Sequence, residues 1–134
     1  MTIQAMTIFS EYLREENDGK ITIIGGFGND IGISQESGTE IVAPPIMATT
    51  FVRFPATKEN HHFKVAAMDG EEEIATSEAD IEGVSMDVPF RSLAIPMQIP
   101  PLHILQAKRI IILLSSPNFE EKVETGSLNF LFNK

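Results

Sequence analysis

Turn-forming residues recur along the whole chain, at intervals too short for helices of ordinary length. Glycines, prolines and Asn-Asp-Gly clusters separate short runs that are rich in Ile, Val, Thr and Phe. This spacing is typical of all-β sandwiches and barrels. We therefore predict an all-β fold, a two-sheet antiparallel β-sandwich of about eight strands with little helix. The predicted strands cover residues 5–12, 20–25, 46–54, 62–68, 74–81, 92–98, 109–115 and 122–132.

The turns between these strands predict three hairpins. They lie at residues 17–19 (Asn-Asp-Gly), 69–70 (Asp-Gly) and 116–119 (Ser-Pro-Asn-Phe). Glycine adopts the positive φ that tight hairpin turns require, and proline fixes φ in the third turn. Residues 100–106 (PPLHILQ) are the one segment expected to form a short helical turn, because proline is tolerated at a helix start.

Alternation of side chains along the strands predicts which residues face the core. Residues 110–114 are apolar at every position, so this strand is expected to be central and covered on both sides. Val123 and Phe130 have opposite parity, and a β-bulge at Gly126 would bring both to the same face. The residues predicted to be buried are Phe63, Val65, Ile111, Leu113 and Phe130.

Length and composition predict one soluble domain over residues 1–134. Hydrophobic residues make up 43% of the 134 residues and charged residues 22%, which excludes a largely disordered chain. No apolar run reaches the roughly 20 residues that span a bilayer. The first 16 residues lack the features of a secretory signal, and the chain has no cysteine. We therefore expect a cytoplasmic protein without disulfides or cysteine-ligated metal.

The charge of the chain is strongly acidic and unevenly distributed. The formal net charge is −9, and residues 65–90 contain eight acidic residues and no Lys or Arg. Without a basic stripe, binding to nucleic acid or to an anionic membrane surface is not expected. The acidic block at 69–87 is interpreted as a solvated face that also protects a strand edge. An alternative is a calcium site at Glu78, Asp80 and Glu82, which share one strand face.

The remaining motifs do not predict catalysis. Residues 25–28 (Gly-Gly-Phe-Gly) lack the features of a phosphate-binding loop or dinucleotide fingerprint, so a kinked strand end is expected. His61 and His62 are adjacent, so on a strand they point to opposite faces, and His103 stands alone. All three are interpreted as surface or hairpin-end histidines. No catalytic residue and no cofactor is predicted.

The last predicted strand carries the candidate interface. Residues 126–132 (GSLNFLF) contain neither charge nor proline. If Leu128 and Phe130 face the core, Asn129 and Leu131 face outward. A homodimer formed through this strand edge or face would cover them. The alternative is that a neighbouring strand of the same chain covers this strand already.

Three segments carry a resemblance to a known family. They are residues 15–31 (EENDGKITIIGGFGNDI), 53–57 (RFPAT) and 61–74 (HHFKVAAMDGEEEI). Together with the C-terminal hairpin they resemble a family of small uncharacterised bacterial and phage-associated proteins, a domain of unknown function. The resemblance implies a β-sandwich and no particular activity. No site residue is carried over from it.

These observations favour a non-catalytic binding or protein-interaction module, whose partner is another protein or a second copy of the chain. The alternative is a β-sandwich that binds a carbohydrate or calcium. The chain has no Trp and one Tyr, which weighs against the aromatic platforms of carbohydrate sites. An enzyme of unknown class is the third possibility.

Overall fold

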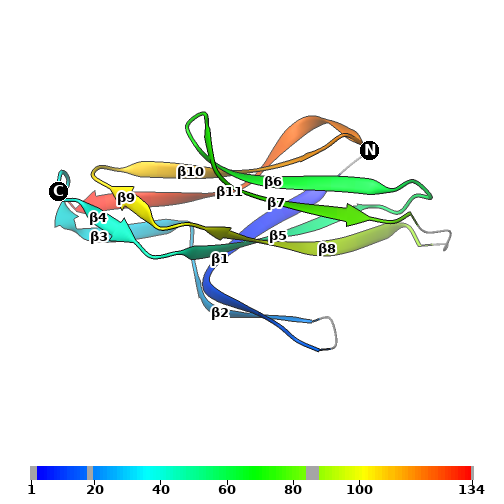
Figure 1. Cartoon of the computed structure of the whole chain (residues 1–134), viewed down its shortest axis with the longest axis horizontal. Coiled ribbons are helices and arrows are strands. Elements are labelled where there is room, and N and C mark those ends of the chain that lie inside the picture. Colours follow the sequence, from blue (N-terminus) through cyan, green and yellow to red (C-terminus); the bar gives the residue numbers. More distant parts are fainter. Residues whose placement is uncertain (1–2, 18–19, 84–87, 134) are drawn as a thin grey trace.

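The computed structural model describes residues 3–17, 20–83 and 88–133, and its regular structure consists of strands alone. Eleven strands form two main sheets and one small sheet (Figure 1). The all-β prediction is thereby confirmed, although about eight strands were expected. Among the described residues there is no helix long and apolar enough to span a bilayer.

The first main sheet has four strands in the order β2-β1-β5-β8, and every neighbouring pair is antiparallel. Its strands are β1 (Gln4–Glu15), β2 (Ile21–Phe27), β5 (Ile46–Pro55) and β8 (Phe90–Ile99).

The second main sheet has five strands in the order β3-β11-β10-β6-β7. Its strands are β3 (Asp30–Glu36), β6 (His61–Asp69), β7 (Glu72–Ile81), β10 (Lys108–Ser116) and β11 (Phe119–Asn133). β3 and β11 pair in parallel, which departs from the predicted antiparallel sheets. A two-stranded sheet joins β4 (Ile41–Ala43) to β9 (Leu102–Ile104).

One hydrophobic core joins the inner faces of both main sheets. Its largest fully buried side chains are aromatic rings and branched aliphatic groups from β1, β5, β6, β8, β9, β10 and β11. The rings of Phe9 and Phe54 come from the four-stranded sheet, and those of Phe63 and Phe130 from the five-stranded sheet. Burial of such rings is the main stabilising contribution of a core of this kind.

Most of the local predictions agree with the structure. β1 and β2 form the first predicted hairpin, whose turn residues Asp18 and Gly19 lie outside the described part of the chain. Gly70 has the expected positive φ, 62°, between β6 and β7. The pairing of β10 with β11 shifts register next to Gly126, and Val123 packs against the core as predicted from the bulge.

The assignment of the inward face of β10 was wrong by one residue. Phe63, Val65 and Phe130 are buried as predicted. Ile111 and Leu113, however, are only partly buried and point away from the core. The buried side chains of β10 are those of Ile110, Ile112 and Leu114. A run that is apolar at every position carries no alternation, so the sequence does not show which parity faces inward.

The expected helical turn at 100–106 is also wrong. Leu102 and Ile104 are buried and His103 is exposed, which is the period-2 pattern of a strand. This segment pairs with β4 instead of forming a helix. β3, β4 and β9 are the three strands that the sequence pattern did not predict.

A chain of buried hydroxyl groups links the two main sheets. Thr7 Oγ1 lies 2.8 Å from Thr50 Oγ1 in its own sheet and 2.7 Å from Thr125 Oγ1 of β11. All three residues are buried. The sheets approach closely here, since a Cβ added at Gly126 would lie 3.3 Å from Thr7 Cβ. Glycine beside the bulge therefore lets the hydroxyl groups meet across the core.

The hairpin of β1 and β2 projects from the body of the molecule (Figure 1). β1 pairs with β5 through Gln4–Ser10, whereas its second half pairs with β2 alone. Gly25 has a φ of 67°, and a Cβ there would come within 2.9 Å of the Glu11 carboxylate. The expected kink in the glycine-rich segment is thus present at Gly25. We call residues 11–17 and 20–25 the arm.

Candidate functional site

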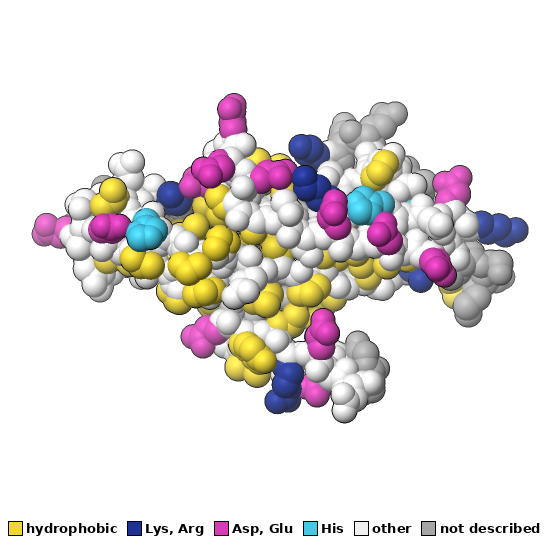
Figure 2. All heavy atoms as spheres, viewed as in Figure 1, with side chains coloured by type: hydrophobic (Ala, Val, Ile, Leu, Met, Phe, Trp, Pro, Cys, Tyr) yellow, Lys and Arg dark blue, Asp and Glu magenta, His cyan; other side chains and the backbone are white. Residues whose placement is uncertain are grey.

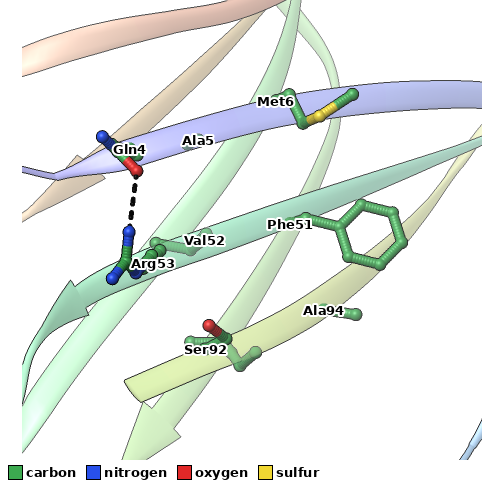
Figure 3. A pocket seen from close by; sticks show the side chains of 9 residues that line it. Gln4, Ala5, Met6, Phe51, Val52, Arg53, Ser92 and Ala94 are labelled. Carbon is green, nitrogen blue, oxygen red and sulfur yellow. Dashed lines mark hydrogen bonds between the residues drawn. The ribbon is translucent and has the colours of Figure 1, made fainter. Parts of the chain in front are cut away.

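An open groove of about 570 Å³ lies on the four-stranded sheet (Figure 3). Its lining residues form three rows that run across the strands. The register places one residue each of β1, β5 and β8 side by side in every row. Side chains two positions apart on a strand share a face, so the outer rows form walls and the middle row a floor. The rows are Met6-Phe51-Ala94, Ala5-Val52-Leu93 and Gln4-Arg53-Ser92.

The two walls of this groove differ in chemistry. Met6 and Phe51 make one wall apolar, and Met6 is 56% exposed. The opposite wall presents the amide of Gln4, the guanidinium of Arg53 and the hydroxyl of Ser92. The groove can therefore hold an apolar group on one side and a hydrogen-bond acceptor on the other.

Arg53 is the charged residue of the groove lining. Its guanidinium carbon lies 4.2 Å from the centroid of the Phe90 ring, and Nη1 donates to Gln4 Oε1 at 3.4 Å. Within the described residues, no ion pair joins Arg53 to a carboxylate. In an acidic chain, this leaves a local positive charge that is stacked on an aromatic ring and accessible.

The apolar wall continues along the outer face of the same sheet. In the described part of the chain, no further strand layer lies on this face. Its outward apolar side chains are those of Met6, Ile8, Met47, Phe51, Ala94 and Pro96. A contiguous apolar surface on a strongly acidic chain is typical of a binding surface.

Some carboxylates of the predicted acidic block are paired with lysine side chains. Asp69 pairs with Lys108 at 3.0 Å, and Glu73 pairs with Lys64 at 3.0 Å. On the face seen in Figure 2, acidic side chains gather over β6 and β7 beside basic ones, above a strip of hydrophobic side chains. Asp87 lies outside the described residues. Asp69 and Glu73 of the block thus form surface ion pairs.

The structure brings together two of the three candidate calcium ligands, but with a histidine between them. Glu78 and Asp80 are exposed on one face of β7, and both contact His62 of β6. Glu82 follows the end of β7 and makes no hydrogen bond to either of them. No group of three or more His, Asp or Glu side chains among the described residues is arranged to hold a metal ion. The geometry therefore gives the calcium prediction no support.

His62 forms a charged cluster with these two carboxylates. Nδ1 lies 2.6 Å from Asp80 Oδ1, and Nε2 lies 3.3 Å from Glu78 Oε1. Hydrogen bonds to Asp80 and then to Glu78 raise the pKa of the imidazole above its ordinary value of 6.5. With both ring nitrogens facing carboxylates, the doubly protonated imidazolium is the favoured form.

We expect His62 to titrate above pH 6.5 in an NMR experiment. Because the folded-state pKa is raised, its contribution to stability is complete below pH 6.5 and is lost as the pH rises through the folded-state value. Asp80→Asn should lower the His62 pKa more than Glu78→Gln does, because Asp80 makes the shorter hydrogen bond. A His62 pKa at or below 6.5, or one unchanged in both variants, would contradict this assignment.

The other two histidines occupy contrasting environments. His61 is only 3% exposed, so its interpretation as a surface histidine was wrong. Its ring packs among those of Phe54, Phe63 and Phe119, and Nε2 lies 3.0 Å from Thr57 Oγ1. His103 is exposed and contacts Glu40 at 2.7 Å. Phe63, Val65 and Ala67 alternate along β6 and face the core. Continuing this alternation two residues toward the start of the strand would have predicted that His61 faces the core as well.

The predicted interface residues lie on an interior strand. From Asn129 onward β11 pairs with β3 on the side opposite β10, so the edge part of that prediction is wrong for these residues. Asn129 Nδ2 donates to Asp30 Oδ1 at 2.8 Å, which ties it to β3. Leu131 is 47% exposed, and association through the face that carries it stays a prediction.

No protein-family model matches the chain. No curated protein matches it either. The candidate site is therefore assigned from its geometry alone.

Proposed function

We propose that the chain is a non-catalytic protein-interaction module, a single two-sheet β-sandwich domain over residues 1–134. The observation that carries this proposal is the groove, with an apolar wall, a polar wall and an arginine that has no carboxylate partner among the described residues. It suits a protein segment that places an apolar side chain against Met6 and Phe51. An acceptor oxygen of the same segment would then accept hydrogen bonds from Arg53.

The composition of the groove favours binding over catalysis. General acid–base or nucleophilic chemistry requires titratable or nucleophilic groups near one another in a concave site. The lining brings together the guanidinium of Arg53 and the hydroxyl of Ser92, with no carboxylate or histidine among the lining residues. We therefore propose a binding role without cofactors.

The remaining expectations are part of the same proposal. The net charge of −9 supports a protein partner rather than nucleic acid or an anionic membrane, and the absence of cysteine is compatible with the cytoplasm. The motifs at 15–31, 53–57 and 61–74 support membership of the bacterial and phage-associated family that they resemble. Carbohydrate or calcium binding is the weaker alternative, because the groove offers neither an indole platform nor a set of carboxylates.

A photo-crosslinking residue at position 92 is expected to capture a partner in the cells that make the protein. Ser92 lines the groove, whereas Gln98 is exposed on the same face of β8, about 20 Å further along the strand. Crosslinker at position 98 is therefore the matched control. The captured protein, once identified and purified, should bind the wild-type chain directly.

The groove variant Met6→Glu should weaken that binding by about tenfold or more. Met6 is 56% exposed, so the substitution buries a charge only in the complex and leaves the fold intact. Equal capture at positions 92 and 98, or unchanged affinity of Met6→Glu, would contradict the proposal. Capture of a small molecule instead would favour the ligand-binding alternative.

A further inference from the structure

The polar wall of the groove consists of hydrogen-bond donors. Figure 3 shows Gln4, Arg53 and Ser92 on one side of the groove, with Met6 and Phe51 on the other. Gln4 Oε1 accepts a hydrogen bond from Arg53, which leaves the amide nitrogen of Gln4 as a donor. The guanidinium has N–H groups that Gln4 does not use, and the hydroxyl of Ser92 can donate as well. Donors grouped around a positive charge suit an anionic acceptor better than a neutral carbonyl.

The strands of the four-stranded sheet place no carboxylate beside Arg53. β2, β5 and β8 contain no acidic residue. The first acidic residue of β1 is Glu11, in the arm, which lies seven positions from Gln4 and thus about 24 Å along the strand. Glu59 and Glu82 lie in the segments after β5 and β7, and within the described residues neither forms an ion pair with Arg53. The positive charge is therefore available to a ligand.

The acidic side chains of β7 lie on the other side of the sandwich. Glu78 and Asp80 contact His62, which points away from the core because its neighbour Phe63 is buried. Sheets that pack face to face are about 10 Å apart. This exceeds the Debye length of about 8 Å at physiological salt. Repulsion between these carboxylates and an anionic group in the groove is therefore largely screened.

The spacing of the two walls indicates the form of the ligand. Met6 and Gln4 are two residues apart on β1, and Phe51 and Arg53 are two residues apart on β5. Two residues of a strand span about 6.8 Å, which is the separation of the walls along each strand. Side chains at positions i and i+2 of an extended peptide share a face and have the same separation. An extended segment over the sheet can therefore contact both walls at once.

We propose that the groove recognises an extended segment of a partner protein in which an Asp or Glu lies two positions from an apolar residue. This inference rests on the proposed function and specifies its ligand. The apolar side chain packs against Met6 and Phe51, and the carboxylate accepts charge-assisted hydrogen bonds from Arg53. The Phe90 ring, 4.2 Å from the guanidinium carbon, holds the guanidinium in place for this contact. Arg53 is thus the residue that selects an acidic side chain over its amide.

Selection from a displayed library of random peptides, each flanked on both sides by fixed sequence, tests this motif. The immobilised wild-type chain should enrich peptides with an acidic residue two positions from an apolar one. Arg53→Gln should lose the preference for the acidic residue, whereas Arg109→Gln should keep it. Arg109 is the matched control, because it is an exposed arginine of the five-stranded sheet and its replacement changes the net charge equally.

An enriched peptide, synthesised with an acetylated and an amidated end, measures the contact itself. Replacing its acidic residue by the corresponding amide should weaken binding to the wild-type chain about tenfold or more. The same replacement should change binding to Arg53→Gln by less than about twofold, because the contact is already lost. This double-mutant cycle isolates the pair from general effects of charge. Circular dichroism of each variant confirms that it remains folded.

The outcomes separate this motif from the proposed function. Peptides that lose binding to Met6→Glu but show no preference for an acidic residue would overturn the motif and leave the proposed function intact. An acidic residue enriched at another spacing would overturn the extended geometry. Enrichment only from a library with free C-termini would move the contact to a chain end and overturn the motif as well. Absence of any peptide that depends on Met6 would contradict both proposals.

Discussion

Replacing Phe130 with alanine is expected to lower the free energy of unfolding by about 3–5 kcal/mol. The ring is 2% exposed and belongs to the core shared by the two main sheets. Its removal takes away dispersion contacts and apolar burial, and β11 cannot collapse into the space because β3 and β10 hold it on both sides. Urea denaturation with an unchanged m-value measures the effect.

The neighbouring residue provides the control for this prediction. Leu131 is 47% exposed and points away from the core, so Leu131→Ala should cost less than about 1 kcal/mol. Similar losses in both variants would mean that the inward face of β11 has been assigned incorrectly.

Thr7→Val is expected to cost about 1–3 kcal/mol, although valine is close to threonine in shape. The substitution removes the hydroxyl that contacts Thr50 in one sheet and Thr125 in the other. Both partners are buried, so each loses a hydrogen bond without gaining access to solvent. Thr125 keeps its 3.5 Å hydrogen bond to the Ile112 carbonyl oxygen, so the cost is mainly the desolvation of the Thr50 hydroxyl rather than a loss of volume.

The triple variant Thr7→Val, Thr50→Val, Thr125→Val distinguishes this cause from poor packing. With all three hydroxyl groups replaced, few buried polar groups are left without partners, and much of the stability should return. Thermal unfolding of the single and triple variants measures this coupling. A triple variant less stable than the sum of its single variants would point to packing instead.

The sequence was most informative where alternation and turn chemistry agree. Phe63 and Val65 alternate with polar residues, and Gly70 follows an aspartate, so the β6–β7 hairpin and its inward face were predicted correctly. β3 was missed because its partner, β11, is far away in the sequence and the pairing is parallel. Such a pairing has no turn motif in the sequence. Strand propensity also depends strongly on the neighbouring strands in the folded sheet.

The groove shows why a binding surface is harder to predict than a fold. Met6, Phe51 and Ala94 belong to three strands that are far apart in the sequence. They adjoin only because strand register places Met6 opposite Phe51 and Phe51 opposite Ala94. A one-residue shift of β5 would turn Phe51 inward and remove the wall. The sequence shows the composition of each strand, whereas register across strands is a property of the folded sheet.

The parallel pairing of β3 with β11 determines when the five-stranded sheet can be completed on the ribosome. Asp30 and its hydrogen-bond partner Asn129 are 99 positions apart. At about 5–20 residues per second, translation supplies β11 roughly 5–20 s after β3. During that interval the nascent β3 edge is unpaired, and Asp30 and Glu36 at its two ends discourage association between neighbouring nascent chains. Completion of this sheet is therefore a late event that follows synthesis of almost the entire chain.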